Sequence, residues 1–433
     1  MRLKNVSDRA ISNNSIRLFI NGQQKTPASF TIEANSVAAV VLSFASKESG
    51  IQQCRIEIND YPVTFDDKFY FSFEVAKNIP VLSINSSERN SDVQNPNNEN
   101  KSLNNLFKDS LFKFTNVPES KIDYSTLSTY DLIIINEVKN ISSGLAQELK
   151  RFVDNGGSLL IFPNANMDPA SYTNFLSSMN VDALEKMDTA NSKVNKINFD
   201  HTIYHDVFEK RSENIDLPVV LGHFKITEHS HSSKQFLLKL QNGDAFLSQY
   251  DHKKGKLYLS AVPLDPEYSN FTRHALFVPT LYKIAVYSQQ VKPLFNIMGK
   301  DEIIEVNNIS VSGENVFHIK GDNNFDIIPE HKVGDHVTDV FVHDQITAAG
   351  NYKLFLGDTV LSGLSFNFDR KESNLNCYSA DELLKQKESA GLNNFSLLEA
   401  GTRSLAELRK ATYRPSLLIR VWYDLPLPEA VPA

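Results

Sequence analysis

A helix end followed directly by a buried strand is encoded in residues 155–163, Asn-Gly-Gly-Ser-Leu-Leu-Ile-Phe-Pro. The paired glycines supply the left-handed backbone that commonly ends a helix, and the apolar run 159–162 is typical of a strand buried on both faces. Upstream, the apolar residues Leu145, Leu149, Phe152 and Val153 form one stripe at helical spacing and predict a helix that Ser142 or Ser143 caps. Residues 132–135, Leu-Ile-Ile-Ile, predict another buried strand. This succession predicts parallel strands with right-handed crossovers, the centre of an open α/β sheet.

Working outward, the same α/β pattern extends over residues 79–290. Its further predicted elements are a strand at 79–84, helices over 103–114 and 170–179, a hairpin of 236–238 and 245–247 around Asn242-Gly243, a strand at 255–260 and a helix over 273–287. On both sides of this domain, short apolar-polar alternation predicts antiparallel strands, with a more continuous strand at 37–44.

The changes of pattern predict four segments. They are an N-terminal β-sandwich at 1–78, the α/β domain at 79–290, a second β-sandwich at 291–370, and a helical C-terminal segment with an irregular tail at 371–433. Ser379 and Glu382 have the spacing of a capping box, which predicts where the C-terminal helix begins.

Composition excludes several classes of protein. The 433 residues are 41% hydrophobic with a formal net charge of −8, so the chain can bury large cores and lacks the basic balance of a nucleic-acid binder. Two cysteines, Cys54 and Cys377, are too few for a disulfide scaffold. No apolar run approaches the roughly 20 residues of a membrane-spanning helix.

The carboxyl ends of the predicted parallel strands are where an open α/β sheet binds ligands. Their residues form no glycine-rich phosphate loop and no G-x-S-x-G elbow, so no cofactor is predicted. Their polar, mostly uncharged side chains suit hydrogen bonding to a carbohydrate or a peptide. The predicted ligand-binding residues are Asn85, Ser87, Asn136, Glu137, Asn164 and Asn166.

Two catalytic alternatives remain open, both of them hydrolases. In the first, Ser86 or Ser87 acts as a nucleophile with Glu137 as its partner, against the simpler interpretation that these serines lie in a solvated loop. In the second, His223, His229 and His231 share one strand face and bind a metal ion. The simpler interpretation of the histidines is an exposed polar edge, since no carboxylate or cysteine follows at ligand spacing.

Several motifs together resemble the large membrane proteins related to the aerotolerance-operon (BatA-type) family. The motifs are residues 64–73 (Thr-Phe-Asp-Asp-Lys-Phe-Tyr-Phe-Ser-Phe), 79–82 (Ile-Pro-Val-Leu), 130–133 (Tyr-Asp-Leu-Ile), 155–159 (Asn-Gly-Gly-Ser-Leu), 274–279 (His-Ala-Leu-Phe-Val-Pro) and 367–373 (Asn-Phe-Asp-Arg-Lys-Glu-Ser). The resemblance implies a central open parallel α/β domain, class I glutamine-amidotransferase-like and flavodoxin-like, flanked by two immunoglobulin-like β-sandwiches.

The resemblance also implies a location and a role. It implies the periplasmic part of an inner-membrane protein of the Gram-negative envelope, anchored by spans outside this sequence and binding other envelope proteins. An amidotransferase-like domain normally carries a cysteine at the bend after the strand 158–162. Here the bend is Pro163-Asn164-Ala165-Asn166, and an asparagine amide cannot form the covalent intermediate. We therefore expect a non-catalytic protein that acts in binding or assembly.

Overall fold

The structure is a computed structural model. It describes residues 1–45, 48–59, 64, 67–86, 99–208, 216–227, 233–289, 292–307, 315–334, 337–373 and 378–392. Ser87, His229, His231 and Cys377 lie outside these residues, as does most of the predicted tail. The chain divides into two compact units, Met1–Arg370 and Lys371–Ala433.

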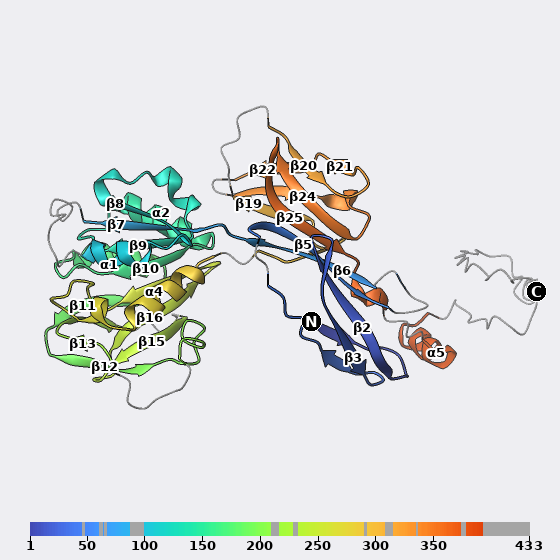
Figure 1. Ribbon diagram of the computed structural model, residues 1–433, viewed down its shortest axis with the longest axis horizontal. Coiled ribbons are helices and arrows are strands. Elements are labelled where there is room, and N and C mark those ends of the chain that lie inside the picture. The colour runs from blue at the N-terminus through green and yellow to red at the C-terminus, as the bar shows by residue number, and fades with distance from the viewer. Residues whose placement is uncertain are drawn as a thin grey trace, which may run out of the picture. The chain divides into compact units, whose positions relative to one another are not determined.

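Residues 79–260, in the middle of the first unit's sequence, contain a nine-stranded sheet, most of whose strands Figure 1 labels. Its order is β13 (Val219–Val220), β12 (Ser192–Ile197), β15 (Lys234–Leu240), β16 (Ala245–His252), β17 (Gly255–Ser260), β10 (Ser158–Phe162), β9 (Leu132–Asn136), β7 (Ile79–Asn85) and β8 (Phe112–Pro118). The neighbours from β8 to β17 are parallel, which was predicted for the strands β7, β9 and β10 but not for β8, part of which was predicted as helix. The predicted open parallel sheet is confirmed only in part, because β16, β15, β12 and β13 add in antiparallel orientation and make the sheet a mixed one. Tight hairpins, such as the one at Asn242-Gly243, can only join antiparallel strands.

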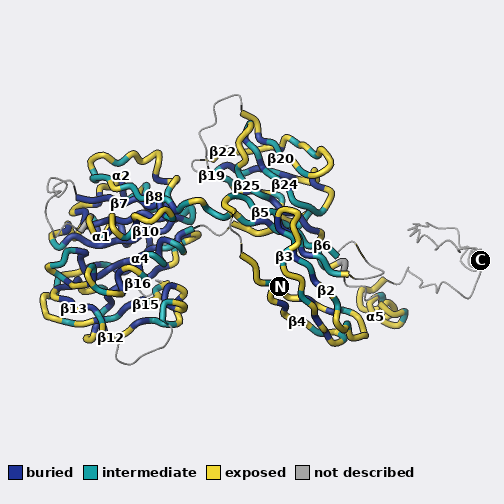
Figure 2. The backbone as a smooth tube through the Cα atoms, in the orientation of Figure 1, coloured by how far each residue is buried: buried dark blue, intermediate teal, exposed yellow. Residues whose placement is uncertain are grey.

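Helices cover both faces of this sheet. One core packs α1 (Glu99–Leu106) and α4 (Phe277–Val286) against the sheet, and the other packs α2 (Ser143–Asp154) and α3 (Pro169–Ser178). The central strands β7, β9 and β10 are accordingly almost wholly buried (Figure 2). Both faces being covered explains why their sequences are continuous apolar runs instead of alternating ones. Among the described residues, short 3₁₀ helices lie at Glu119–Lys121, Tyr124–Thr129, Phe271–Arg273, His343–Gln345 and Arg370–Ser373.

Two predicted elements are shorter than expected. The helix predicted over 103–114 ends at Leu106, and the chain then enters strand β8. The ring of Phe107 lies 5.0 Å from that of Phe112 and 5.2 Å from that of Phe114, so these apolar side chains meet across a turn and not along one helix. The strand predicted at 37–44 is confirmed only as β4 (Val37–Ala39), and Val41 beyond it is 83% exposed.

Smaller sheets form the remaining parts of the first unit. N-terminal residues form a four-stranded sheet, β3-β2-β5-β6, and a pair, β1-β4; C-terminal residues form a five-stranded sheet, β18-β25-β24-β20-β21, and a three-stranded sheet, β19-β23-β22. The strand bounds are β1 Arg2–Lys4, β2 Ile11–Ile20, β3 Gln23–Ile32, β5 Gly50–Ile58, β6 Lys68–Val75, β18 Asn296–Ile297, β19 Ile303–Asn307, β20 Phe317–Lys320, β21 Asp326–Ile327, β22 Glu330–Val333, β23 Val337–Phe341, β24 Gly350–Leu356 and β25 Thr359–Asn367. Each region has its own apolar core. That these regions are immunoglobulin-like sandwiches, and that unit one comprises three domains, remain predictions.

The N-terminal and C-terminal sheets contact each other through β6 and β25. The Asn367 amide donates to the Tyr70 carbonyl at 2.7 Å and accepts from the Tyr70 N–H at 2.8 Å. Gly363 on β25 approaches β5 so closely that an added Cβ would lie 2.4 Å from Cγ2 of Ile51. A glycine is needed here because any side chain would occupy space that Ile51 already fills.

The second unit contains helix α5 (Ala380–Ser389). Its Ser379 side chain accepts from the Glu382 N–H while the Glu382 carboxylate accepts from the Ser379 N–H, which confirms the predicted capping box. None of the helices within the described ranges combines the length and hydrophobicity needed to cross a bilayer.

Candidate functional site

Strand β7 pairs with β8 on one side and β9 on the other, so the direction of chain progression reverses between β7 and β9. This reversal is the ordinary ligand position of an open α/β sheet. Asn85 and Asn136 meet there as direct partners, and the Asn136 side-chain amide donates to Oδ1 of Asn85 at 2.8 Å. The Asn85 amide in turn donates to Oδ1 of Asn116. The sequence predicted both residues to follow buried strands, and the hydrogen bond between their side chains is a finding of the structure.

These amides are nevertheless interior groups. Asn85 is 2% exposed and Asn136 is 4% exposed. Ser86, which follows β7, is also buried at 4%. Because buried polar atoms are stabilised by mutual hydrogen bonds, the amide cluster joins the ends of β7, β8 and β9. The proposed role of Asn85 and Asn136 in ligand binding remains untested.

Glu137 immediately follows β9 and has an unusual backbone. Its φ is +55°, a left-handed value that costs a side-chain-bearing residue energy. Three hydrogen bonds hold it there: its N–H donates to the Phe162 carbonyl at 2.9 Å, its carbonyl accepts from the Asn164 amide at 2.8 Å, and its Oε1 accepts from the Asp265 N–H at 2.7 Å. At 3% exposure, the Glu137 carboxylate is engaged inside the protein.

The bend after β10 was the expected position of a nucleophile. Asn164 is 2% exposed, and its side chain binds the Glu137 carbonyl and accepts from the Asn166 N–H at 2.8 Å. None of residues 163–166 has a left-handed φ, and the left-handed residue at these strand ends is Glu137, one strand earlier in the sequence. Asn166 is exposed. It therefore differs from the buried Asn85, Asn136, Glu137 and Asn164.

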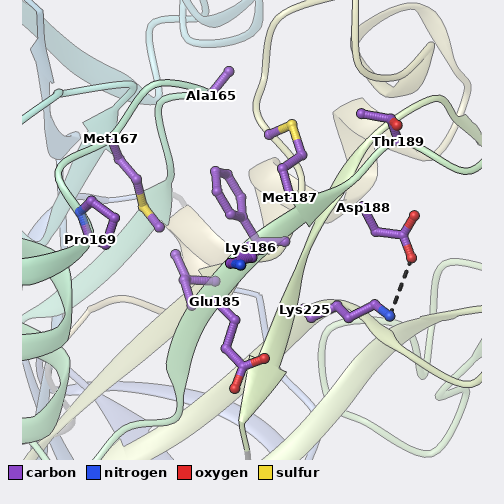
Figure 3. A pocket seen from close by; sticks show the side chains of 11 residues that line it. Ala165, Met167, Pro169, Glu185, Lys186, Met187, Asp188, Thr189 and Lys225 are labelled. Carbon is purple, nitrogen blue, oxygen red and sulfur yellow. Dashed lines mark ion pairs between the residues drawn. The ribbon is translucent and has the colours of Figure 1, made fainter.

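A cavity of about 980 Å³ lies beside this bend (Figure 3). It is lined by Ala165, Met167, Pro169, Leu184, Glu185, Lys186, Met187, Asp188, Thr189, Phe224 and Lys225. Met167, Leu184 and Phe224 are at most 7% exposed, and they also belong to the core shared with α2 and α3. The cavity therefore combines an apolar floor with charged residues. Its volume is near the upper end of the roughly 300–1,000 Å³ typical of small-molecule sites.

One wall of the cavity is a two-stranded antiparallel sheet with a β-bulge. Strand β11 (Ala183–Asp188) pairs with β14 (His223–Thr227), and the register shifts between Leu184 and Met187. Leu184 pairs with Ile226 and Met187 with Phe224, so Glu185 and Lys186 together oppose the single residue Lys225. Such bulges redirect side chains and interrupt pairing. The bulge could not be predicted from the sequence, because an inserted residue interrupts the alternating pattern by which a strand is recognised.

The charges at the wall are unequally paired. Lys225 Nζ lies 3.5 Å from Asp188 Oδ2 (Figure 3), and the Ala190 N–H donates to Asp188 Oδ1 at 2.9 Å. That backbone N–H, followed by Lys225, holds the pKa of Asp188 below its ordinary value. The Glu185 carboxylate accepts from the Thr227 hydroxyl. Within the part of the chain that the structure describes, Lys186 forms no ion pair.

His223, the described member of the possible metal site, is wholly buried at the start of β14. Its Nε2 lies 2.8 Å from Asp244 Oδ2. Among the described residues, no group of three or more histidine, cysteine or acidic side chains is arranged to hold a metal ion. The prediction for His229 and His231 concerns residues that the structure does not describe.

A second hollow of about 550 Å³ lies between α2 and α3. Its lining includes the N-cap residues of both helices, Ser142 and Asp168, and mostly hydroxyl, amide and small side chains. Asp168 caps α3 by accepting from the Ala170 and Ser171 N–H groups. The polar atoms at this end of the hollow thus already serve the helix termini.

Comparison with known proteins gives distant likenesses only. No protein-family model and no curated protein matches the chain. A cytoplasmic protein from Salmonella typhimurium is 16% identical over 49% of this chain and all of its own, with a TM-score of 0.40. A ThuA-like protein from Bacteroides uniformis is 13% identical over 53% of this chain and 95% of its own, with a TM-score of 0.39. A β-galactosidase from Bacillus circulans is 15% identical over 60% of this chain and 41% of its own, with a TM-score of 0.34. All three TM-scores are below 0.5, so the function of this chain is inferred from its own geometry.

Proposed function

We propose that the α/β domain is a non-catalytic binding module whose ligand enters the cavity beside the bend 163–166. One observation supports this most directly. The polar side chains at the strand ends are engaged with one another and with the backbone, whereas the adjoining cavity is lined by the core residues Met167, Leu184 and Phe224 and by Met187, which is only partly buried. Binding energy at such a site comes from removing apolar surface from water, at roughly 25 cal/mol per Å².

The kinds of side chain in the cavity favour binding over a covalent reaction. Two methionines, Met167 and Met187, provide flexible and polarizable surface that can adapt to an irregular apolar ligand. The bend beside them carries two amides and a methyl group, and amides are poor nucleophiles. A fold can retain its architecture while its site serves another purpose.

The cellular setting of this proposal comes from the resemblance to BatA-type proteins. We place the binding module in the periplasmic part of an inner-membrane protein, where it would contribute to the assembly of envelope proteins. The motifs at 64–73, 155–159 and 274–279 support this setting. Fractionating the source cells tests it, because recovery of the native protein in the cytosol would contradict an envelope location.

The binding proposal is tested with the uncharged dye 1-N-phenylnaphthylamine, which fluoresces strongly in apolar surroundings. The full chain is titrated with the dye and compared with Ala165→Trp, in which a large ring enters the cavity. Ala348→Trp is the matched control, because Ala348 is exposed and does not line the cavity. We expect saturable binding to the wild type and the control, and at least about tenfold weaker binding to Ala165→Trp. Equal binding by all three proteins would contradict the proposal.

A further inference from the structure

We infer that the ligand of the cavity is a single-chain amphiphile, an apolar tail carrying one carboxylate headgroup. This inference rests on the proposed binding function and specifies the class of ligand. It follows from the way the cavity places an apolar floor next to one ammonium group that lacks an ionic partner among the described residues.

The apolar floor would take the tail. Met167 is 7% exposed, Leu184 is 3% and Phe224 is 4%, and Met187 packs against the same core. Polar side chains along this floor would favour a sugar or a peptide backbone, whereas aliphatic, thioether and aromatic groups favour a hydrocarbon chain. The two methionines can change rotamer without leaving a void, which suits a flexible tail.

The bulge would provide the recognition of the headgroup. It sets Glu185 and Lys186 opposite Lys225: Lys225 pairs with Asp188, Glu185 accepts a hydrogen bond from an uncharged hydroxyl, and Lys186 has neither kind of partner among the described residues. Asp188 lies 3.5 Å from Lys225, and Thr227 donates to Glu185. In Figure 3 the Glu185 carboxylate points away from Met167 and Met187. Lys186 is therefore the cation available to an anionic group whose tail lies on the methionines.

The same bulge argues against an extended peptide as the ligand. Strand β11 pairs only with β14 among the described strands, so its other edge could in principle accept a further strand. A bulge at Glu185 and Lys186 breaks the regular spacing of N–H and C=O groups along that edge, and natural proteins use bulges to prevent strand addition. A single-chain amphiphile has no backbone that needs such pairing.

The experiment displaces bound 1-N-phenylnaphthylamine with three competitors that share a twelve-carbon tail. They are laurate, uncharged dodecyl maltoside and dodecyltrimethylammonium, each used below the concentration at which it forms micelles. They are tested on the wild type, on Lys186→Glu and on Lys332→Glu. Lys332 is the matched control, because it is an exposed strand lysine that does not line the cavity.

For the wild type and the control, we expect laurate to displace the dye at about three- to fivefold lower concentration than dodecyltrimethylammonium, the range that one partly exposed ionic contact supplies. Lys186→Glu should reverse this order and leave the affinity for the uncharged dye within about twofold. Retained dye affinity also shows that the variant is folded at the cavity.

The outcomes separate the two proposals. Failure of the wild type to bind the dye overturns the binding function and the ligand class together. Dye binding with equal displacement by all three competitors, or an order that Lys186→Glu leaves unchanged, overturns the ligand class alone. Displacement by a short apolar peptide at lower concentration than laurate also overturns it, in favour of a peptide ligand.

Discussion

At position 137 the glycine variant should be more stable than the alanine variant, the reverse of the order usually found for these two substitutions. The backbone of Glu137 has a φ of +55°, which glycine adopts without the steric cost that a Cβ brings. Its side chain is 3% exposed and its Oε1 accepts from the Asp265 N–H at 2.7 Å. Both substitutions remove this hydrogen bond equally, so their difference isolates the backbone strain.

The magnitudes follow from these contacts. Loss of a buried hydrogen bond to a charged acceptor lowers the free energy of unfolding by about 1.5–3 kcal/mol in either variant. Glycine relieves the backbone strain of about 1–2 kcal/mol that remains in the alanine variant. It also destabilises the folded state by about 0.4–1 kcal/mol, because its unfolded chain has the larger conformational entropy. We therefore expect Glu137→Gly to be more stable than Glu137→Ala by about 1 kcal/mol, obtained as the difference of these values.

Glu148 on α2 is the matched control, since it is a half-buried glutamate in regular helical structure. In a helix alanine is the more stabilising residue, so the free energy of unfolding of Glu148→Ala should exceed that of Glu148→Gly by about 1 kcal/mol. The assay is urea unfolding of the full chain followed by circular dichroism, together with hydrogen exchange at the Asp265 amide. If Glu137→Ala equals or exceeds Glu137→Gly in stability, the strain assigned to this position does not exist.

Three further predictions concern other sites. Burial, opposed by Lys292, raises the pKa of Asp131 to about 6, so the stability due to its neutral form is present below its ordinary pKa of 3.8 and is lost as pH rises through 6. The free energy of unfolding of Asp131→Asn relative to wild type should therefore rise by about 2 kcal/mol between pH 4 and 7.5. Urea unfolding measures this difference, and a value that does not change with pH would contradict the prediction. Gly363→Ala places a Cβ 2.4 Å from Ile51 Cγ2 and should lower the free energy of unfolding by about 1–3 kcal/mol. Thermal unfolding measures this loss, and an unchanged melting temperature would contradict it. Burial raises the pKa of Cys54 to about 12, so peptide mass spectrometry should find it unmodified by thiol reagents at pH 8 until denaturant is added.

Much of the order of strands and helices in the α/β region could be predicted because local patterns specify it. Buried strands such as 132–135 and 158–162 are continuous apolar runs, and parallel strands end at one edge of a sheet, where Asn85 and Asn136 lie. The antiparallel strands join through tight hairpins such as the one at Asn242-Gly243, a local signal that is present in the sequence.

The cavity could not be predicted in the same way. Its lining comes from segments far apart in sequence, Met167 near the start of α3, Met187 on β11 and Phe224 on β14. Strand β11 carries Glu185, Lys186 and Asp188 and lacks an alternating pattern, since its bulge displaces the period by one residue. The sequence alone does not distinguish a lysine beside a cavity, such as Lys186, from any other surface lysine; the three-dimensional placement of its neighbours does.

Stability and binding are therefore assigned to different residues of the same edge of the sheet. At the reversal of strand order, Asn85, Asn136 and Glu137 fill with hydrogen-bonded polar groups the place where many open α/β sheets admit a ligand. The space that remains open lies one loop further, where the bend 163–166 passes alongside β11. Because that space is bordered by the exposed Lys186 and not by the buried amides, a ligand can be accommodated there without breaking the contacts that join the strand ends. Under the proposed function, this separation lets a strained residue such as Glu137 serve the fold while the neighbouring cavity is available for a ligand.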